Sequence, residues 1–373
     1  MRIKPRTMFA ALCLSASFAL SAAADENAAK FASLLYPIEV KLPAGAKEGD
    51  VFFRTPLSEV PAAAYDSVLI QGEMPDAGIR VDLETGDASA PAAASYRSEA
   101  FHRLPSGRFW ARYRVPLSRR PLRFAVINAG LKTGSALTIY ETELFVAAES
   151  KEGPPQGTGV PYVPDPALFL PADAPFKVIR RADWKAAPPT EAYTPHEPKF
   201  FTLHHTQSHY PETYEKAVEE MQFIQDFHQN GRGWIDIAYH FLIDPAGNIF
   251  EGRPIKALGA HVKNHNTGNI GISIMGSYAP PVHNVFTKAA QDSFVAIGRY
   301  LKDTYEVPVS SFYAHRDLGP TDCPGDDLYA KKGLLRDLIF TPSPLPGVPA
   351  DPQSPNPAQR RSLNQLLQYL AKP

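Results

Sequence analysis

The sequence predicts two domains of different class: an all-β, sandwich-like domain at residues 25–150, then an α/β domain with a central mixed sheet flanked by helices at 176–340. In the first part, short runs such as "GIRVDLE" and "FWARYRV" alternate apolar and polar residues between Gly-containing breaks, which is typical of sandwich strands. In the second part, strand-like and helix-like runs alternate. Residues 151–175 begin with the Pro/Gly-rich run "KEGPPQGTGVPYVPDP", so we expect a linker there and two domains that fold separately and can reorient.

The first 24 residues have the pattern of a cleaved export signal. A basic start, "MRIKPR", precedes an apolar stretch that carries several serines, and small residues stand before Asp25. Leu12 rather than a small residue precedes Cys13, which argues against a lipid anchor. We therefore expect an exported protein, periplasmic or secreted, with no transmembrane segment in its mature form.

The cysteine count and the net charge limit which kinds of site and partner we expect. Cys13 leaves with the signal, so Cys323 is the only remaining thiol and no internal disulfide can form. A lone thiol in an exported protein is exposed to oxidation unless something occupies it, and a metal is the expected occupant. Removing residues 1–24 leaves a net charge of about −4, without a polybasic face, which excludes nucleic acid or anionic lipid as an expected partner.

The C-terminal part, residues 341–373, reads as a Pro-rich spacer followed by a short helix. Its leucines form a helical stripe (Leu363, Leu366, Leu367 and Leu370), which we expect to pack back onto a domain rather than to bind a partner. We expect the protein to be a monomer.

The elements of the α/β domain follow in order. "YEKAVEEMQFIQDFHQNGRG" predicts an amphipathic helix with Ala217, Met221, Ile224 and His228 on one side and Gly231 as its stop. "WIDIAYHFLID" predicts a strand that turns at "PAGN" into "IFEGRP", and "NIGISIMG" predicts a buried strand. A second helix is expected in "TKAAQDSFVAIGRYLKDTY", and a last strand, "SFYAHRD", leads into the loop "LGPTDCPG".

Three potential metal ligands lie at the ends of these elements. The strand "FFTLHH" ends in His204 and His205, another ends at His315, and Cys323 follows in the loop. For an isolated His pair, the more common reading is a solvated strand-end histidine beside a satisfied core residue. With His315 and Cys323 at the same sheet edge, however, two imidazoles and a thiolate form a good zinc donor set. Three protein ligands leave a position open for water, which is the pattern of a catalytic zinc site.

Five runs, in this order, resemble the peptidoglycan recognition proteins and the related zinc-dependent N-acetylmuramoyl-L-alanine amidases (amidase type 2): "VIRRADWKAAPP", "FTLHHT", "IDIAYHFLIDPAGNIFEGRP", "GAHVKNHNTGNIGISIMGSY" and "YAHRDLGPTDCPGDDLY". The resemblance covers roughly residues 178–335. It implies that His204, His315 and Cys323 hold Zn²⁺ and that Tyr239 and Thr321 assist catalysis. Phage members have lysine at the position of Thr321, whereas many animal members have threonine.

The resemblance implies an enzyme that cleaves the amide bond between N-acetylmuramic acid and L-alanine in bacterial peptidoglycan. Members that only bind the cell wall typically lack the cysteine ligand, and Cys323 is present. Tyr239 would then donate a hydrogen bond to the developing oxyanion, with a buried strand tyrosine as the alternative reading. His205 is expected to pack beside His204 or to fix its tautomer. The motifs place no carboxylate clearly as a general base.

Substrate contacts are expected at positions that line the family's groove: Arg253, His261, Asn266 and Asn269. Each also has a simpler interpretation, as a surface ion pair, a loop histidine or turn-forming asparagines. Two function classes stay open, a zinc amidase acting on peptidoglycan and a non-catalytic peptidoglycan-binding or sensing protein on the same fold. A cytosolic recycling amidase fits less well, because of the export signal.

Overall fold

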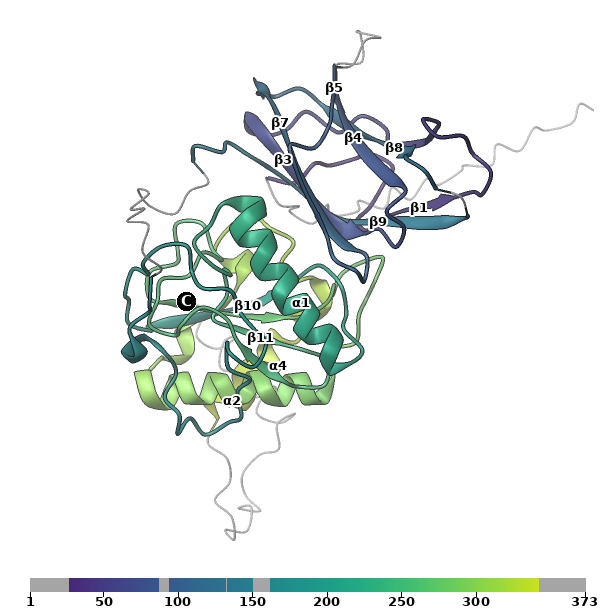
Figure 1. Ribbon diagram of the computed structural model, residues 1–373. Coiled ribbons are helices and arrows are strands. Elements are labelled where there is room, and N and C mark those ends of the chain that lie inside the picture. The colour runs from purple at the N-terminus through teal and green to yellow at the C-terminus, as the bar shows by residue number, and fades with distance from the viewer. Residues whose placement is uncertain (1–26, 87–93, 132, 150–161, 342–373) are drawn as a thin grey trace, which may run out of the picture.

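The computed structural model describes residues 27–86, 94–131, 133–149 and 162–341. We call residues 27–149 the β region and residues 162–341 the α/β region (Figure 1). The expected signal, the C-terminal spacer with its leucine stripe and most of the "KEGPPQGTGVPYVPDP" run lie outside the described residues. No helix in the described ranges is long and apolar enough to cross a membrane.

The β region contains two antiparallel sheets. A five-stranded sheet has the order β1-β9-β3-β7-β6, and a four-stranded sheet has the order β2-β8-β4-β5. The strands are β1 (Ile38–Leu42), β2 (Val51–Arg54), β3 (Tyr65–Glu73), β4 (Ile79–Thr85), β5 (Ala94–Tyr96), β6 (Ala100–Arg103), β7 (Arg108–Ser118), β8 (Leu122–Asn128) and β9 (Ser135–Phe145). The runs "GIRVDLE" and "FWARYRV" lie in β4 and β7.

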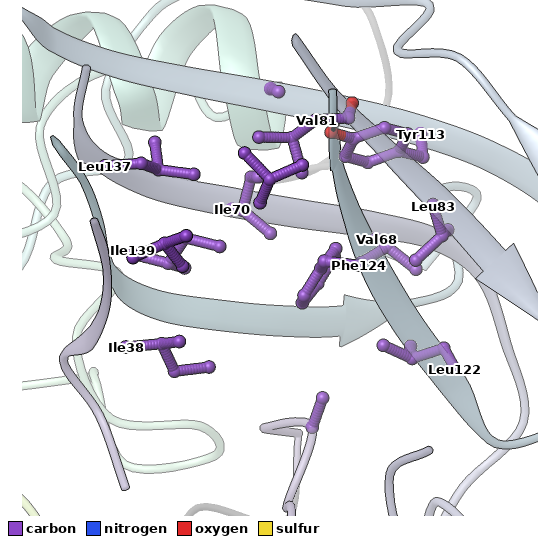
Figure 2. Close-up of a cluster of buried hydrophobic side chains, with 14 of the residues drawn as sticks. Ile38, Val68, Ile70, Val81, Leu83, Tyr113, Leu122, Phe124, Leu137 and Ile139 are labelled. Carbon is purple, nitrogen blue, oxygen red and sulfur yellow. Dashed lines mark hydrogen bonds between the residues drawn. The ribbon is translucent and has the colours of Figure 1, made fainter. Parts of the chain in front are cut away.

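One hydrophobic core joins the two sheets, and Figure 2 shows part of it. Because side chains alternate along a strand, every second residue of each strand points to the same face of its sheet. Both sheets contribute: Val68, Ile70, Leu137 and Ile139 come from the five-stranded sheet, and Val81, Leu83, Leu122 and Phe124 from the four-stranded sheet.

The α/β region is built on a five-stranded mixed sheet of order β12-β11-β13-β10-β14. Strand β10 runs parallel to both of its neighbours, and only the edge strand β12 is antiparallel, to β11. The strands are β10 (Phe200–His205), β11 (Phe241–Ile243), β12 (Ile249–Glu251), β13 (Asn269–Ile274) and β14 (Phe312–Ala314).

Helices cover both faces of this sheet, as predicted. Helix α1 packs on one face through Ala217, Met221 and Ile224, and α2 and α4 pack on the other (Figure 1). The α-helices are α1 (Tyr214–Asp226), α2 (Lys288–Tyr305), α3 (Asp326–Tyr329) and α4 (Lys332–Phe340). Short 3-10 turns are η1 (Pro166–Leu168), η3 (Val309–Ser311) and η4 (His315–Asp317).

The end of the first helix differs from the prediction. Helix α1 stops at Asp226 and continues as a π-helical turn, η2 (Phe227–Arg232), and the residue that ends this turn is Gly233 rather than Gly231. Gly233 has φ of 79°, in the left-handed region that glycine adopts without steric cost, and so it is the better stop. The expected strand "WIDIAYHFLID" is also shorter, because only Phe241–Ile243 joins the sheet.

The two regions share a buried interface, which differs from the expectation that they reorient. Leu69 of β3 and Trp110 of β7 belong to the same hydrophobic cluster as Phe223 and Phe227 of the α1–η2 segment. Arg108 of β7, which is 3% exposed, forms an ion pair with Glu220 of α1, which is 1% exposed. Charged and apolar side chains that leave water together in this way fix one orientation of the regions.

Candidate functional site

The strand geometry separates the two adjacent histidines. His204 and His205 end β10, and successive side chains of a strand point to opposite faces. His205 lies on the face of Leu203, which packs toward α2 and α4, and its Nδ1 accepts from the backbone N–H of Tyr278. His204 points to the α1 face and is 0% exposed.

A second ligand reaches His204 from the neighbouring parallel strand. Leu203 of β10 pairs with Ala314 of β14, so His204 and His315 each follow a paired residue and emerge at the same end of the sheet. Their ring centroids lie 4.7 Å apart. Carboxyl ends of parallel strands are the usual position of α/β sites.

The loop after β14 brings the third ligand. One ring nitrogen each of His204 and His315 and the Sγ of Cys323 all lie within 4.8 Å of one another, and Sγ is 3.4 Å from Nδ1 of His204. Tetrahedral zinc bound by nitrogen and sulfur holds its ligands at roughly 3.5 Å from each other. The three side chains therefore fit zinc both in donor type and in spacing. They are the only group of this kind within the described ranges.

Thr321 supports the cysteine loop. Its Oγ1 accepts a hydrogen bond from the backbone N–H of Cys323 at 3.2 Å, and the backbone N–H of Arg316 donates to the Cys323 carbonyl at 3.1 Å. The first bond orders the loop that carries Cys323, and the second ties this loop to the turn that carries His315. Thr321 is buried, so its hydroxyl acts on the loop in this structure.

His261 fixes the tautomer of His204. The Nε2 of His261 lies 3.2 Å from the carbonyl oxygen of Asn269, which can only accept, so this nitrogen carries the proton. The Nδ1 of His261 is then an acceptor, and at 3.0 Å it receives the Nε2–H of His204. His204 is left with a free lone pair on Nδ1, which faces Cys323. The expectation that His205 might set this tautomer is wrong, because His205 points to the other face.

Burial keeps the imidazoles neutral, as metal ligands must be. It holds the pKa of His204 well below its ordinary value, an effect that His315 and His261 reinforce. Burial also lowers the pKa of His315 to about 4.

Tyr239 lies beside the ligands, with its ring centroid 5.2 Å from that of His204. Burial and then the proximity of Cys323 raise its pKa well above the ordinary tyrosine value. The phenol is therefore protonated at neutral pH and can donate a hydrogen bond. This placement agrees with a hydrogen-bond donor next to the metal site.

The other residues expected to contact substrate serve the protein itself. Arg253 is 1% exposed and donates to the carbonyls of Asp236, Ile237 and Leu258, so its guanidinium is bound to the protein's own backbone. Asn269 is fully buried and bonded to Thr202 and to the carbonyl of His265.

Asn266 and His261 depart from the expectation in a similar way. The Oδ1 of Asn266 accepts from the backbone N–H groups of His261 and Val262, which orders the loop behind His204. His261 is buried with both ring nitrogens engaged. The loop thus supports the metal ligands from behind.

Sequence reasoning missed a ring stack that leads to Tyr239. The His228 ring stacks on Trp234 at 4.9 Å between centroids and meets the Tyr239 ring edge-on at 6.0 Å. The sequence did carry one signal, a histidine and a tryptophan within eleven residues of Tyr239. Only the π-helical turn, however, brings the rings together.

Comparisons with known proteins place this site in a family. Residues 194–326 match the family model described as N-acetylmuramoyl-L-alanine amidase. Peptidoglycan-recognition protein SC2 of Drosophila melanogaster is 36% identical over 134 residues, which span 35% of this chain and 70% of that protein. Peptidoglycan recognition protein 1 of Bos indicus is 34% identical over 157 residues, 41% of this chain and 80% of that protein.

Among solved structures, Drosophila PGRP-LB is 28% identical, with a TM-score of 0.36, and covers 42% of this chain and 91% of its own. The β region lies outside the residues that match the family model. On the identity of its α/β region to these proteins, the chain belongs to the family of peptidoglycan recognition proteins and type 2 N-acetylmuramoyl-L-alanine amidases.

Proposed function

We propose that the protein is a zinc-dependent amidase that cleaves the bond between N-acetylmuramic acid and L-alanine in bacterial peptidoglycan. In this hydrolysis, water adds across the C–N bond, leaving a carboxylate on the lactyl group and freeing the amino group of L-alanine. The observation that carries the proposal is the complete set of His204, His315 and Cys323, with ligand atoms within 4.8 Å of one another.

The residues divide the chemical work. His204, His315 and Cys323 would hold the zinc, which when bound polarises a carbonyl and lowers the pKa of water to about 7. Tyr239 stays protonated and is the donor toward the carbonyl oxygen, where negative charge develops. Thr321 holds the Cys323 loop, and His261 holds the His204 ring.

A second candidate is a non-catalytic peptidoglycan-binding or sensing protein. It is favoured by the relatives, which are named for peptidoglycan recognition. The two candidates differ in whether zinc-dependent hydrolysis is observed, since a protein that only binds peptidoglycan needs no open metal position.

The deciding experiment measures zinc and product in one preparation. The mature chain is purified, its zinc is quantified by elemental analysis, and it is incubated with sacculi while newly exposed alanine amino groups are labelled and counted. The amidase predicts about one zinc per chain and amino-group release that stops with chelator and returns with added Zn²⁺. Binding to sacculi with no release at any zinc level would establish the second candidate instead.

The proposal also covers the location, oligomeric state, partners and domains of the enzyme. We propose export to the periplasm or outside the cell through residues 1–24, action as a monomer, and peptidoglycan glycan and stem peptide as the partners. We also propose a division into a sandwich-like domain at 25–150, a connecting segment at 151–175 and the amidase domain at 176–340. This domain division is supported by the separate hydrophobic core that the two N-terminal sheets share.

A further inference from the structure

The π-helical turn η2 is held by side chains of the β region. Arg112 of β7 donates through Nη1 to the carbonyls of Asn230 and Gly231, at 3.0 and 2.9 Å. Leu69 of β3 lies so close that a Cβ on Gly231 would be 3.2 Å from its Cδ2. π-helical turns are rare and are frequently found at functional sites.

Just before the turn, Asp226 is fixed by the same region. Its carboxylate accepts from the Nε1–H of Trp110 at 2.6 Å and contacts the His102 ring, two residues of adjacent strands in the five-stranded sheet. Asp226 is the last residue of α1. Both the entry and the end of η2 are therefore set by contacts that cross between the regions.

Arg232, the last residue of η2, connects the β region to the ring stack. Its Nε lies 2.8 Å from Oε2 of Glu143 in β9. Its guanidinium lies over the Phe145 ring at 4.6 Å and over the Trp234 ring at 4.8 Å. The cation is thus placed between a ring of the β region and a ring of the α/β region, with a carboxylate fixing it.

From Trp234 the contacts continue to the metal ligands. Trp234 stacks on His228, which meets Tyr239, which in turn lies against His204. The His228 Nδ1 also accepts from the backbone N–H of Ala238 at 3.3 Å, immediately before Tyr239. His228 therefore positions Tyr239 through both its ring and the backbone.

We propose that Glu143 and Phe145 of the β region are positioning residues of the amidase reaction, which hold Tyr239 against the metal site through Arg232, Trp234 and His228. This inference rests on the proposed amidase function. The family model matches residues 194–326, which lie in the α/β region, so the inference assigns part of the catalytic support to a region outside that match.

The test compares four single variants of the full mature chain on a soluble muropeptide: Glu143→Gln, Phe145→Ala, Phe145→Tyr and Glu84→Gln. Glu143→Gln keeps the shape and removes the charge, and Phe145→Ala removes the ring. Glu84→Gln is the matched control, because Glu84, like Glu143, is a carboxylate paired with arginine (Arg54 and Arg123), but it lies in the four-stranded sheet; the Glu84 side chain is 10% exposed and that of Glu143 is 19% exposed.

We expect Glu143→Gln and Phe145→Ala to lower kcat by about 10- to 100-fold, as misplacement of a catalytic group does, with KM and zinc content close to wild type. Phe145→Tyr, which keeps a ring over Arg232, should restore most of kcat, and Glu84→Gln should leave it unchanged. Wild-type kcat in both Glu143→Gln and Phe145→Ala would overturn the inference, as would an equal loss in Glu84→Gln.

A readout without turnover separates this inference from the amidase proposal. If the wild type hydrolyses nothing, the amidase proposal fails, and the ¹⁵N chemical shift of the His228 ring then tests the contact path alone. Phe145→Ala should shift this signal and leave that of the exposed His283 in place. An unmoved His228 signal would refute the positioning role.

Discussion

Replacing Arg108 with Met tests whether the two regions form one stable unit. Arg108 donates to Glu220 through Nε and Nη2 at 2.9 and 3.0 Å, and to the Gly72 carbonyl and Gln71 Oε1 at 2.7 and 3.0 Å. Methionine fills similar space without donating. Glu220, which is almost completely buried, would keep Ser208 as a side-chain donor, at 2.8 Å.

The magnitude follows from the buried charge that remains. Breaking a buried ion pair by removing one partner costs about 3–5 kcal/mol, because the other charge loses its compensation. Replacing both partners, as in Arg108→Met with Glu220→Met, should recover most of that loss, since well-packed apolar residues substitute for such pairs at little cost. In this double-mutant cycle, the double variant should therefore lose less stability than the sum of the two single losses, which is the sign of a favourable coupling between Arg108 and Glu220.

The assay is urea unfolding at pH 7, followed by far-UV circular dichroism and by tryptophan fluorescence, for wild type, both single variants and the double variant. Coincident unfolding transitions from the two probes indicate one cooperative unit. If Arg108→Met lies within about 1 kcal/mol of wild type, or if the double variant is less stable than both singles, the interface does not have the role assigned to it.

Four further results are expected. Cys323→Ser should lose zinc and hydrolysis, because a hydroxyl is a far poorer zinc ligand than a thiolate, and full turnover with zinc retained would remove Cys323 from the site. Tyr239→Phe should keep zinc but lower kcat by about 10²- to 10³-fold, as for loss of one oxyanion donor, and an unchanged rate would make Tyr239 a packing residue. His261→Phe should weaken zinc binding by about 10- to 100-fold in a chelator competition, since His204 loses its acceptor, and unaltered affinity would refute the tautomer argument. Burial lowers the pKa of His228 from 6.5 to about 3, so the unfolded chain binds more protons between these values. The free energy of unfolding should then fall as pH drops below 6.5, by up to about 1.4 kcal/mol per pH unit from this residue, and His228→Phe should flatten the slope measured by urea titrations at pH 5, 6 and 7.

The sequence was sufficient for the elements that repeat a simple pattern. The helix at Lys288–Tyr305 begins after its capping Thr287, and the strand at Asn269–Ile274 is buried on both faces, as a continuous apolar run predicts. The candidate histidines could also be placed from the sequence, because His204 ends β10 and His315 directly follows β14, its parallel neighbour, whereas Cys323 lies in the loop beyond β14.

The supporting residues were not predictable in this way. The role of His261 depends on which atom faces the Asn269 carbonyl, and spacing along the chain does not determine this. Arg253 resembles a ligand-binding arginine in the sequence, but three backbone carbonyls of one loop cluster satisfy it. The interface depends on Arg108 and Glu220, which are far apart in the chain and carry no local pattern.

The pairing of β10 with β14 has a consequence for how a metal enters. His204 and His315 emerge from two hydrogen-bonded strands, and the Cys323 loop is tied to the turn at His315 by a backbone hydrogen bond from Arg316. In small zinc-binding modules the free energy of metal binding is also the free energy of folding, because no site exists before the ion arrives. Here the hydrogen-bonded strands and loop hold the donors in place, so binding of an ion costs little free energy for ordering the chain. Removing the ion with a chelator should leave a folded protein that binds zinc again.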